Sequence, residues 1–183
     1  MRFAFAALCA VVLAVAAFLF GCQGVGGGFA QVSNLTLSSP AFQDGGMLPV
    51  KYTCDGSDVN PPLQISNIPN GTQSLALVVE DPDAPMGTWI HWIMWNIPPD
   101  TASIGEHSVP PGAQQGSNTF GKLRWDGPCS AAGTTHRYLF RLYALDKVLN
   151  LPEKSAKPRL EAEMQGHVLG QTLLTVKYAR PLS

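Results

Sequence analysis

The chain has 183 residues with 12 basic and 13 acidic side chains, which gives a formal net charge of −1 at neutral pH. A protein of this length folds as one domain with a hydrophobic core of its own. Nucleic-acid-binding proteins carry a strong basic field, and this near-neutral balance excludes that class, so we expect no nucleic-acid partner.

The first 21 residues are typical of a lipoprotein signal peptide. A single basic residue, Arg2, precedes an apolar run at 3–20, and the small residue Gly21 stands directly before Cys22. The sequence Leu-Phe-Gly-Cys at 19–22 resembles the lipobox of bacterial lipoproteins, which predicts cleavage before Cys22 and a lipid on its thiol. The alternatives are a secretory signal and an uncleaved membrane anchor, because 18 apolar residues just suffice to span a bilayer.

Residues 22–31 are rich in glycine and are interpreted as a flexible tether that holds residues 32–183 close to a membrane. Each interpretation of the N-terminus predicts an exported protein. With the lipid in place, the domain is anchored to the cell membrane or outer membrane and faces the periplasm or the cell exterior. Removal of residues 1–21 takes away one basic side chain, so the mature chain has 11 basic and 13 acidic side chains and a net charge of −2.

The four cysteines divide according to their position. Cys9 lies in the signal peptide and Cys22 is the predicted lipid site, which leaves Cys54 and Cys129. An even pair in an exported domain predicts a disulfide, and two separate buried thiols are the alternative. No third or fourth ligand stands at a suitable spacing, so we expect no zinc site.

Short apolar runs separated by Gly, Pro, Asn and Asp predict β-strands joined by loops. One helix is expected from Ala156 to Gly166, where Pro158 suits the first turn and Leu160 and Met164 share a face. This pattern predicts a mainly β protein, an antiparallel β-sandwich with one or two short helices. In chain order, the expected strands are Asn34–Ser38, Ser74–Asp81, Thr88–Ile97, Arg137–Leu145 and Gln171–Tyr178.

Strand alternation assigns polar side chains to faces that are otherwise apolar. Asp81 continues the apolar face of its strand, and His136 and Tyr138 begin the apolar face of theirs. Alternation assigns His91 to the face that holds Trp95. Because buried polar groups without partners are costly, we expect these four polar residues to share a pocket, where they contact each other or a ligand.

Eight short motifs follow one another between about Leu35 and Tyr178, and their order is more specific than any one of them. They are Tyr-Thr-Cys-Asp-Gly at 52–56, Pro-Pro-Leu at 61–63, Asp-Pro-Asp-Ala-Pro at 81–85, His-Trp-Ile-Met-Trp-Asn at 91–96, Gly-Pro-Cys at 127–129, His-Arg-Tyr-Leu-Phe at 136–140, Leu-Tyr-Ala-Leu-Asp at 142–146 and Gly-His-Val-Leu at 166–169. In this combination the chain resembles the phosphatidylethanolamine-binding proteins, in the bacterial branch called Raf kinase inhibitor-like proteins.

The resemblance implies a β-sandwich over residues 32–183, with a small pocket at one end that takes phosphate-like anions or phospholipid head groups. It implies no metal and no cofactor. Asp83 and Arg137 would brace the loops around the pocket. Carried over onto the matching positions, the pocket walls would be Asp81, Pro85, His91, Gly127, His136 and Tyr138.

Asp81 has three interpretations, because a carboxylate repels a phosphate. It holds a histidine in one tautomer and favours the imidazolium of His91 or His136 by raising its pKa. Alternatively, it meets the ammonium of an ethanolamine head group, or it only forms a turn together with Asp83. We prefer the first, since it serves any phosphoryl ligand. The donors would be the two histidine rings, the Tyr138 hydroxyl and backbone amides near Gly127.

We therefore expect a non-catalytic, membrane-tethered binding protein for phosphoryl-type anions, phospholipid head groups or phosphorylated partners. An inhibitor module with an unknown protein partner is a related interpretation. The alternative from another class is a hydrolase that uses His91 or His136 as general base. The sequence contains no Gly-x-Ser-x-Gly elbow, and Ser130 in its loop is a poor nucleophile. Two histidines and an aspartate also suit an iron-type facial triad, but they lie far apart in the sequence.

Overall fold

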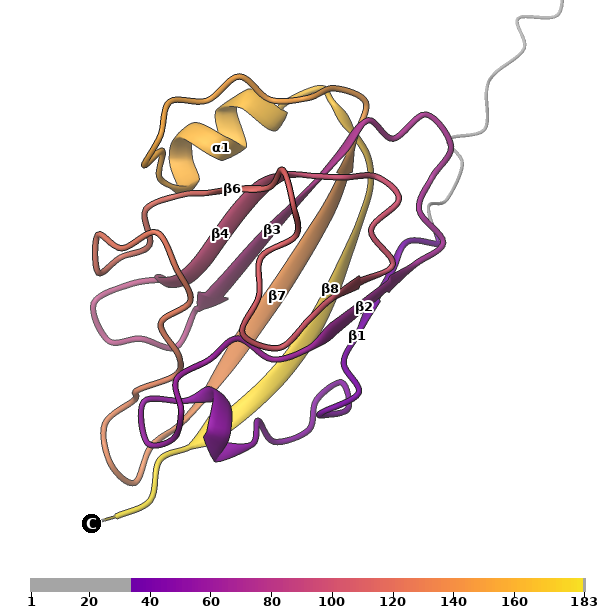
Figure 1. Ribbon diagram of the computed structural model, residues 1–183. Coiled ribbons are helices and arrows are strands. Elements are labelled where there is room, and N and C mark those ends of the chain that lie inside the picture. The colour runs from indigo at the N-terminus through magenta and orange to yellow at the C-terminus, as the bar shows by residue number, and fades with distance from the viewer. Residues whose placement is uncertain (1–33, 183) are drawn as a thin grey trace, which may run out of the picture. The chain divides into compact units, whose positions relative to one another are not determined.

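A computed structural model describes residues 34–182, so the predicted signal peptide, the Cys22 lipid site and the tether lie outside the described residues. Within 34–182, no helix is long and apolar enough to cross a membrane. The elements of this part of the chain (Figure 1) are β1 (Thr36–Ser38), a 3-10 turn (Val50–Tyr52), β2 (Leu63–Ser66), β3 (Ser74–Asp81), β4 (Trp89–Ile97), β5 (Ser103–Ile104), β6 (Gln114–Gln115), β7 (Thr135–Leu145), α1 (Lys157–Met164) and β8 (Val168–Ala179).

Two antiparallel sheets make up the fold. The larger sheet has the strand order β6-β4-β3-β7-β8, and the smaller one has the order β1-β2-β5. Strand β3 is central in the larger sheet, and all eight of its residues are buried. A strand that is covered on both faces reads as a continuous apolar run, as 75–79 does.

The two faces of the larger sheet are covered by separate hydrophobic cores. The first core lies on the face that meets the smaller sheet, and it includes the rings of Trp92 and Phe140. The second core lies on the opposite face, where Leu160 and Met164 of α1 pack with Trp95. Burial on both faces explains why the central strands contain so few polar side chains.

The predicted fold class is confirmed: the protein is mainly β, with two antiparallel sheets and one short α-helix. Strand β3 has the predicted bounds, whereas β7 and β8 begin earlier than predicted because they pair with each other along their whole length. Helix α1 lies inside the predicted range, with Pro158 in its first turn. The sequence did not predict β2, β5 and β6, because strands of two to four residues show too little periodicity.

A β-bulge at His91 corrects one face assignment. Val79 of β3 pairs with Trp92, but the next residue, Glu80, pairs with Ile90, so His91 is an extra residue in β4. The extra residue interrupts the alternation of side chains. The prediction that His91 shares a face with Trp95 is therefore wrong: Trp95 packs under α1, whereas His91 lies against the ring of Tyr138 in the first core.

Phe140 tests how closely the first core is packed. Its side chain is fully buried, and its ring lies 6.0 Å from that of Trp125 and 5.8 Å from that of Phe42. Phe140→Ala leaves a cavity that cannot collapse, so we expect the free energy of unfolding to fall by about 3–5 kcal/mol in urea titrations. Leu173→Ala, at an exposed position of β8, is the control and should change the free energy of unfolding by less than about 0.5 kcal/mol.

Candidate functional site

A cavity of about 540 Å³ opens where β3 ends and where β4 and β7 begin. Its volume lies in the range of sites for small molecules. Because β3 pairs antiparallel with β4 and with β7, these three termini lie side by side at one end of the strands of the larger sheet. Residues far apart in the sequence therefore meet there. The lining residues are Asp81, Asp83, Ala84, Pro85, Trp89, His91, Phe120, Cys129, Ser130, Ala131, Thr134 and His136.

A pair of side chains, buried Asp81 and partly buried His136, joins the end of β3 to the start of β7. Nδ1 of His136 donates a hydrogen bond to Oδ2 of Asp81 at 2.7 Å. The other oxygen of Asp81 accepts the backbone N–H of Asp83 at 2.8 Å. Asp81 therefore holds the proton of His136 on Nδ1 and leaves Nε2 available to a ligand.

His91 is held in a different state. Its Nδ1 donates to the backbone carbonyl of Asp126 at 2.6 Å, and its ring is buried edge-on against Tyr138, with the ring centroids 5.2 Å apart. Burial lowers the pKa of His91 and outweighs the attraction of the Asp126 carbonyl and of the Asp81 charge. His91 is therefore neutral at neutral pH, because the rise in pKa that the Asp81 charge contributes is smaller than the fall caused by burial.

Two buried hydroxyl groups near the cavity have no hydrogen-bond partner within the described residues: Oγ of Ser130 and the hydroxyl of Tyr138. Tyr138 does not line the cavity; it lies behind His91, and burial raises its pKa far above the ordinary value. The Ser130 hydroxyl partly offsets that rise, although the two hydroxyls do not form a hydrogen bond of standard geometry. Unsatisfied buried hydroxyls cost free energy, and of these two residues only Ser130 lines the cavity.

Gly127 has a packing function and does not line the cavity. Its backbone N–H donates to Oδ1 of Asp58 at 2.6 Å, so this amide is not available to an anion. A side chain at Gly127 would place its Cβ only 2.4 Å from the carbonyl oxygen of Tyr52. Glycine is therefore required for the close approach of the two segments, and the amide role expected for it is not supported by the geometry.

Asp83 and Arg137 brace the loop that follows β3. Arg137 donates from Nε and Nη2 to the two carboxylate oxygens of Asp83 at 2.9 and 2.7 Å, and its backbone N–H adds a third bond at 2.9 Å. The guanidinium is thereby paired at the outer side of the loop and does not line the cavity. No lysine or arginine is among the lining residues in the described part of the chain. Charge inside the cavity thus depends on aspartates and histidines.

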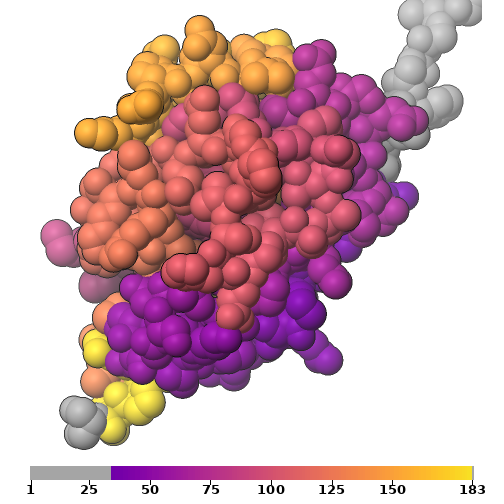
Figure 2. Space-filling view, viewed as in Figure 1, coloured from indigo at the N-terminus to yellow at the C-terminus, as the bar shows by residue number. Residues whose placement is uncertain are grey.

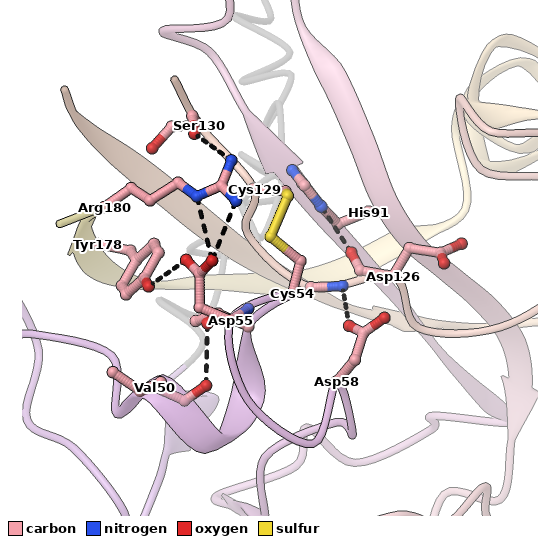
Figure 3. The surroundings of a disulfide bond; sticks show 12 residues. Val50, Cys54, Asp55, Asp58, His91, Asp126, Cys129, Ser130, Tyr178 and Arg180 are labelled. Carbon is pink, nitrogen blue, oxygen red and sulfur yellow. Dashed lines mark hydrogen bonds and ion pairs between the residues drawn. A yellow bond between two sulfur atoms is a disulfide. The ribbon is translucent and has the colours of Figure 1, made fainter. Parts of the chain in front are cut away.

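The predicted disulfide between Cys54 and Cys129 is confirmed, with the two Cα atoms 5.4 Å apart and a sequence separation of 75 (Figure 3). Because Cys129 lines the cavity, the disulfide attaches one wall of the site to the segment at 50–58. Asp55 in that segment accepts hydrogen bonds from Tyr178 and from Arg180, at 2.6 and 3.1 Å. The wall is thus held by a covalent bond and by hydrogen bonds from Tyr178 of β8 and from Arg180, which directly follows β8.

Among residues 34–182, no group of three or more histidine, cysteine, aspartate or glutamate side chains is arranged to hold a metal ion. Sequence reasoning missed Phe120 as a lining residue, and it left Trp89 and Ser130 out of the predicted pocket walls. Phe120 and Ser130 lie in loops, where no periodicity assigns a side chain to a face, and Trp89 follows the displaced register near the bulge.

Removal of the disulfide should destabilise the protein. On the chain-entropy model, a closed loop of about 75 residues contributes up to about 4.5 kcal/mol to the free energy of unfolding. We expect the double variant Cys54→Ser/Cys129→Ser to lose much of this contribution to the free energy of unfolding, as measured in urea titrations. Treatment of the wild type with a reductant should give the same midpoint as the double variant, and an unchanged midpoint in the variant would contradict the stabilising role.

The Asp83–Arg137 pair predicts a pH-dependent stability. Hydrogen bonds from Arg137 lower the pKa of Asp83 from 3.8 to about 2. Because the folded-state pKa is the lower one, this stabilisation is present above about pH 4 and disappears as the pH falls toward 2. The difference in free energy of unfolding between wild type and Asp83→Asn should therefore become smaller as the pH falls from about 4 toward 2. A difference that stays constant over this range would show that the Asp83–Arg137 ion pair does not cause it. Asp100→Asn, at an exposed carboxylate, is the control.

Comparison with known proteins gives the same family as the motif order. The family description "Phosphatidylethanolamine-binding protein" matches residues 38–179. A UPF0098 protein of Methanothermobacter thermautotrophicus is 44% identical over 151 residues, which cover 80% of this chain and 99% of that protein. A second UPF0098 protein, from Pyrococcus horikoshii, is 43% identical over 178 residues, and the alignment covers 93% of this chain and 88% of that protein.

Solved structures share the fold. A putative phosphatidylethanolamine-binding protein homologue of Chlamydia trachomatis has a TM-score of 0.77 and 38% identity, with 81% of this chain and 99% of that chain covered. The Escherichia coli protein YbcL, described as a member of the mammalian family, has a TM-score of 0.74 and 28% identity, with 79% and 98% covered. By sequence and by fold, the chain belongs to the phosphatidylethanolamine-binding protein family.

Proposed function

We propose that this protein binds small phosphoryl-type anions in the cavity, such as the phosphate of a phospholipid head group or of a phosphorylated partner. The observation that carries the proposal is the hydrogen-bonded Asp81–His136 pair at the cavity wall. The name of the family, which refers to a phospholipid with a phosphoryl head group, supports the same class of ligand.

His136 decides whether the cavity accepts an anion. With a single proton, held on Nδ1 by Asp81, its Nε2 is an acceptor and repels phosphoryl oxygens. A second proton turns Nε2 into a donor, and the adjacent carboxylate of Asp81 stabilises the resulting imidazolium. No permanent cation lines the cavity within the described residues, so this proton supplies the positive charge that an anion needs.

The other polar groups complete the proposed site. Neutral His91 has its Nδ1 proton bound to the Asp126 carbonyl, so its Nε2 accepts a hydrogen bond from a protonated ligand group. Both oxygens of Asp81 already accept hydrogen bonds, so an ethanolamine ammonium would have to share them with His136 and Asp83. We therefore assign Asp81 to the support of His136 rather than to direct contact with an ammonium group.

We propose further that the protein is exported and is anchored by a lipid on Cys22 to the cell membrane or outer membrane, where it faces the periplasm or the exterior. The apolar run and the Leu-Phe-Gly-Cys sequence at 19–22 support this location. The disulfide between Cys54 and Cys129 supports an oxidising compartment, because cytosolic thiols are kept reduced.

Calorimetric titration with glycerophosphoethanolamine tests the binding proposal. This phosphodiester keeps one negative charge near neutral pH, so a change in affinity reports on the protein. We expect the affinity to weaken between about pH 6 and pH 8, and to be lost at both values in His136→Ala. The control is His167→Ala, which removes a second histidine–aspartate pair, with Asp146, outside the cavity. An affinity that does not weaken toward pH 8 would refute the imidazolium role.

The same variants distinguish binding from the other candidate functions. In the hydrolase alternative, His91 or His136 acts as general base, and phosphomonoesters or peptides would be turned over. Incubation with both substrate classes, with and without a chelator, measures this directly. Turnover that disappears in His136→Ala would replace the binding proposal. A protein partner that remains bound to His136→Ala in a pull-down would instead indicate an inhibitor module that does not use the cavity.

A further inference from the structure

Two neighbouring loop tips beside the cavity hold apolar side chains out in solvent. Met86, in the loop from β3 to β4, is 89% exposed, and Phe120 and Leu123 in the next loop at 117–125 are 47% and 36% exposed. The ring of Trp89, the first residue of β4 after the β3–β4 loop, lies edge-on to that of Phe120 at 5.1 Å, so the two loops are neighbours. We call Met86, Trp89, Phe120, Lys122 and Leu123 the rim. The tip of the β3–β4 loop projects at the left edge of Figure 2.

The loop at 117–125 is fixed to the sheet, so it cannot readily bury its apolar side chains by folding back. Thr119 bonds to the backbone of Ile90 in β4 with both its hydroxyl and its N–H, at 2.8 and 3.0 Å. Asn118 spans the base of the loop: its amide donates to Asp126 at 2.7 Å, and its oxygen accepts the N–H of Lys122 at 2.9 Å. Apolar side chains that are held in water on rigid loop tips indicate a surface on which something binds.

The same loop carries positive charge. Lys122 and Arg124 share one oxygen of Asp126, at 3.0 and 3.1 Å, so two cations face a single carboxylate and the loop keeps one positive charge. The chain as a whole has a net charge of −1. The ammonium of Lys122 also lies 5.3 Å from the centre of the Phe120 ring. Tryptophan and phenylalanine beside lysine and arginine are the combination that binds the interface of an anionic bilayer.

We propose that the rim docks on the surface of a bilayer that contains anionic lipids, with Met86 and Leu123 inserted among the head groups. A folded protein partner fits less well, because a stable protein interface buries about 800 Å² on each side and the rim offers five side chains on two protruding tips. The inference goes beyond the proposed function: Met86 and Leu123 do not line the cavity, so docking and anion binding are separable.

Vesicle sedimentation of residues 32–183 tests the inference without any contribution from the N-terminal segment. This region folds on its own, since a solved relative consists almost entirely of the same domain. We expect binding to vesicles of phosphatidylcholine with phosphatidylglycerol, and weak binding to phosphatidylcholine alone or in high salt. Met86→Ser/Leu123→Ser should reduce the bound fraction by about fivefold or more. Val148→Ser/Leu173→Ser, at exposed apolar positions outside the rim, is the matched control.

Three outcomes would overturn the inference: no binding to anionic vesicles, equal loss in both double variants, or self-association in light scattering that Met86→Ser/Leu123→Ser abolishes. The last would make the rim a contact between two copies of the chain. Titration of Met86→Ser/Leu123→Ser with glycerophosphoethanolamine should give the wild-type affinity, and His136→Ala should still bind vesicles. A failure of the anion site and a failure of the rim are therefore distinguishable.

Discussion

Strand β3 is buried on both faces, so the polar group that ends it must find partners at the border of the core. Asp81 finds them in His136 of β7 and in the backbone amide of Asp83. One carboxylate thereby joins two neighbouring strand ends to the loop that follows, and the cavity opens at this junction. The orientation of the His136 ring at the cavity wall depends on this interaction.

The bulge in β4 places a second histidine at the same junction. A regular strand would direct His91 toward α1, away from the cavity. The extra residue turns its ring into the core beside Tyr138, where burial keeps it neutral and the Asp126 carbonyl fixes its tautomer. Two histidines at one site thus have different partners: Nδ1 of His136 bonds to a carboxylate, whereas Nδ1 of His91 bonds to a backbone carbonyl.

The walls of the cavity are held by contacts between distant parts of the chain. The disulfide attaches Cys129 to the segment at 50–58, and Asp58 in that segment binds the amide of Gly127. On the other side, the Asp83–Arg137 pair and the anchored loop at 117–125 fix the rim. These contacts hold the cavity walls together, and a preorganised site loses little conformational entropy when a ligand enters.

Much of this arrangement could be predicted from the sequence, because its signals are local. Alternation along single strands identified Asp81 and His136 as polar ends of apolar faces, and the cysteine count identified the disulfide. The order of the motifs identified the family and the sandwich. Residues in loops, such as Phe120, gave no comparable signal, because a loop has no periodicity that assigns its side chains to a face.

The sequence by itself therefore determined the fold class and the strand ends that meet at the site, since these follow from patterns within each segment. Only the tertiary structure decided the face of His91, because the bulge depends on its pairing with β3. It also decided that the Gly127 amide is occupied, because its partner Asp58 lies 69 residues away. Burial and hydrogen-bond partners are properties of the folded chain, and they set the protonation of each group at the site.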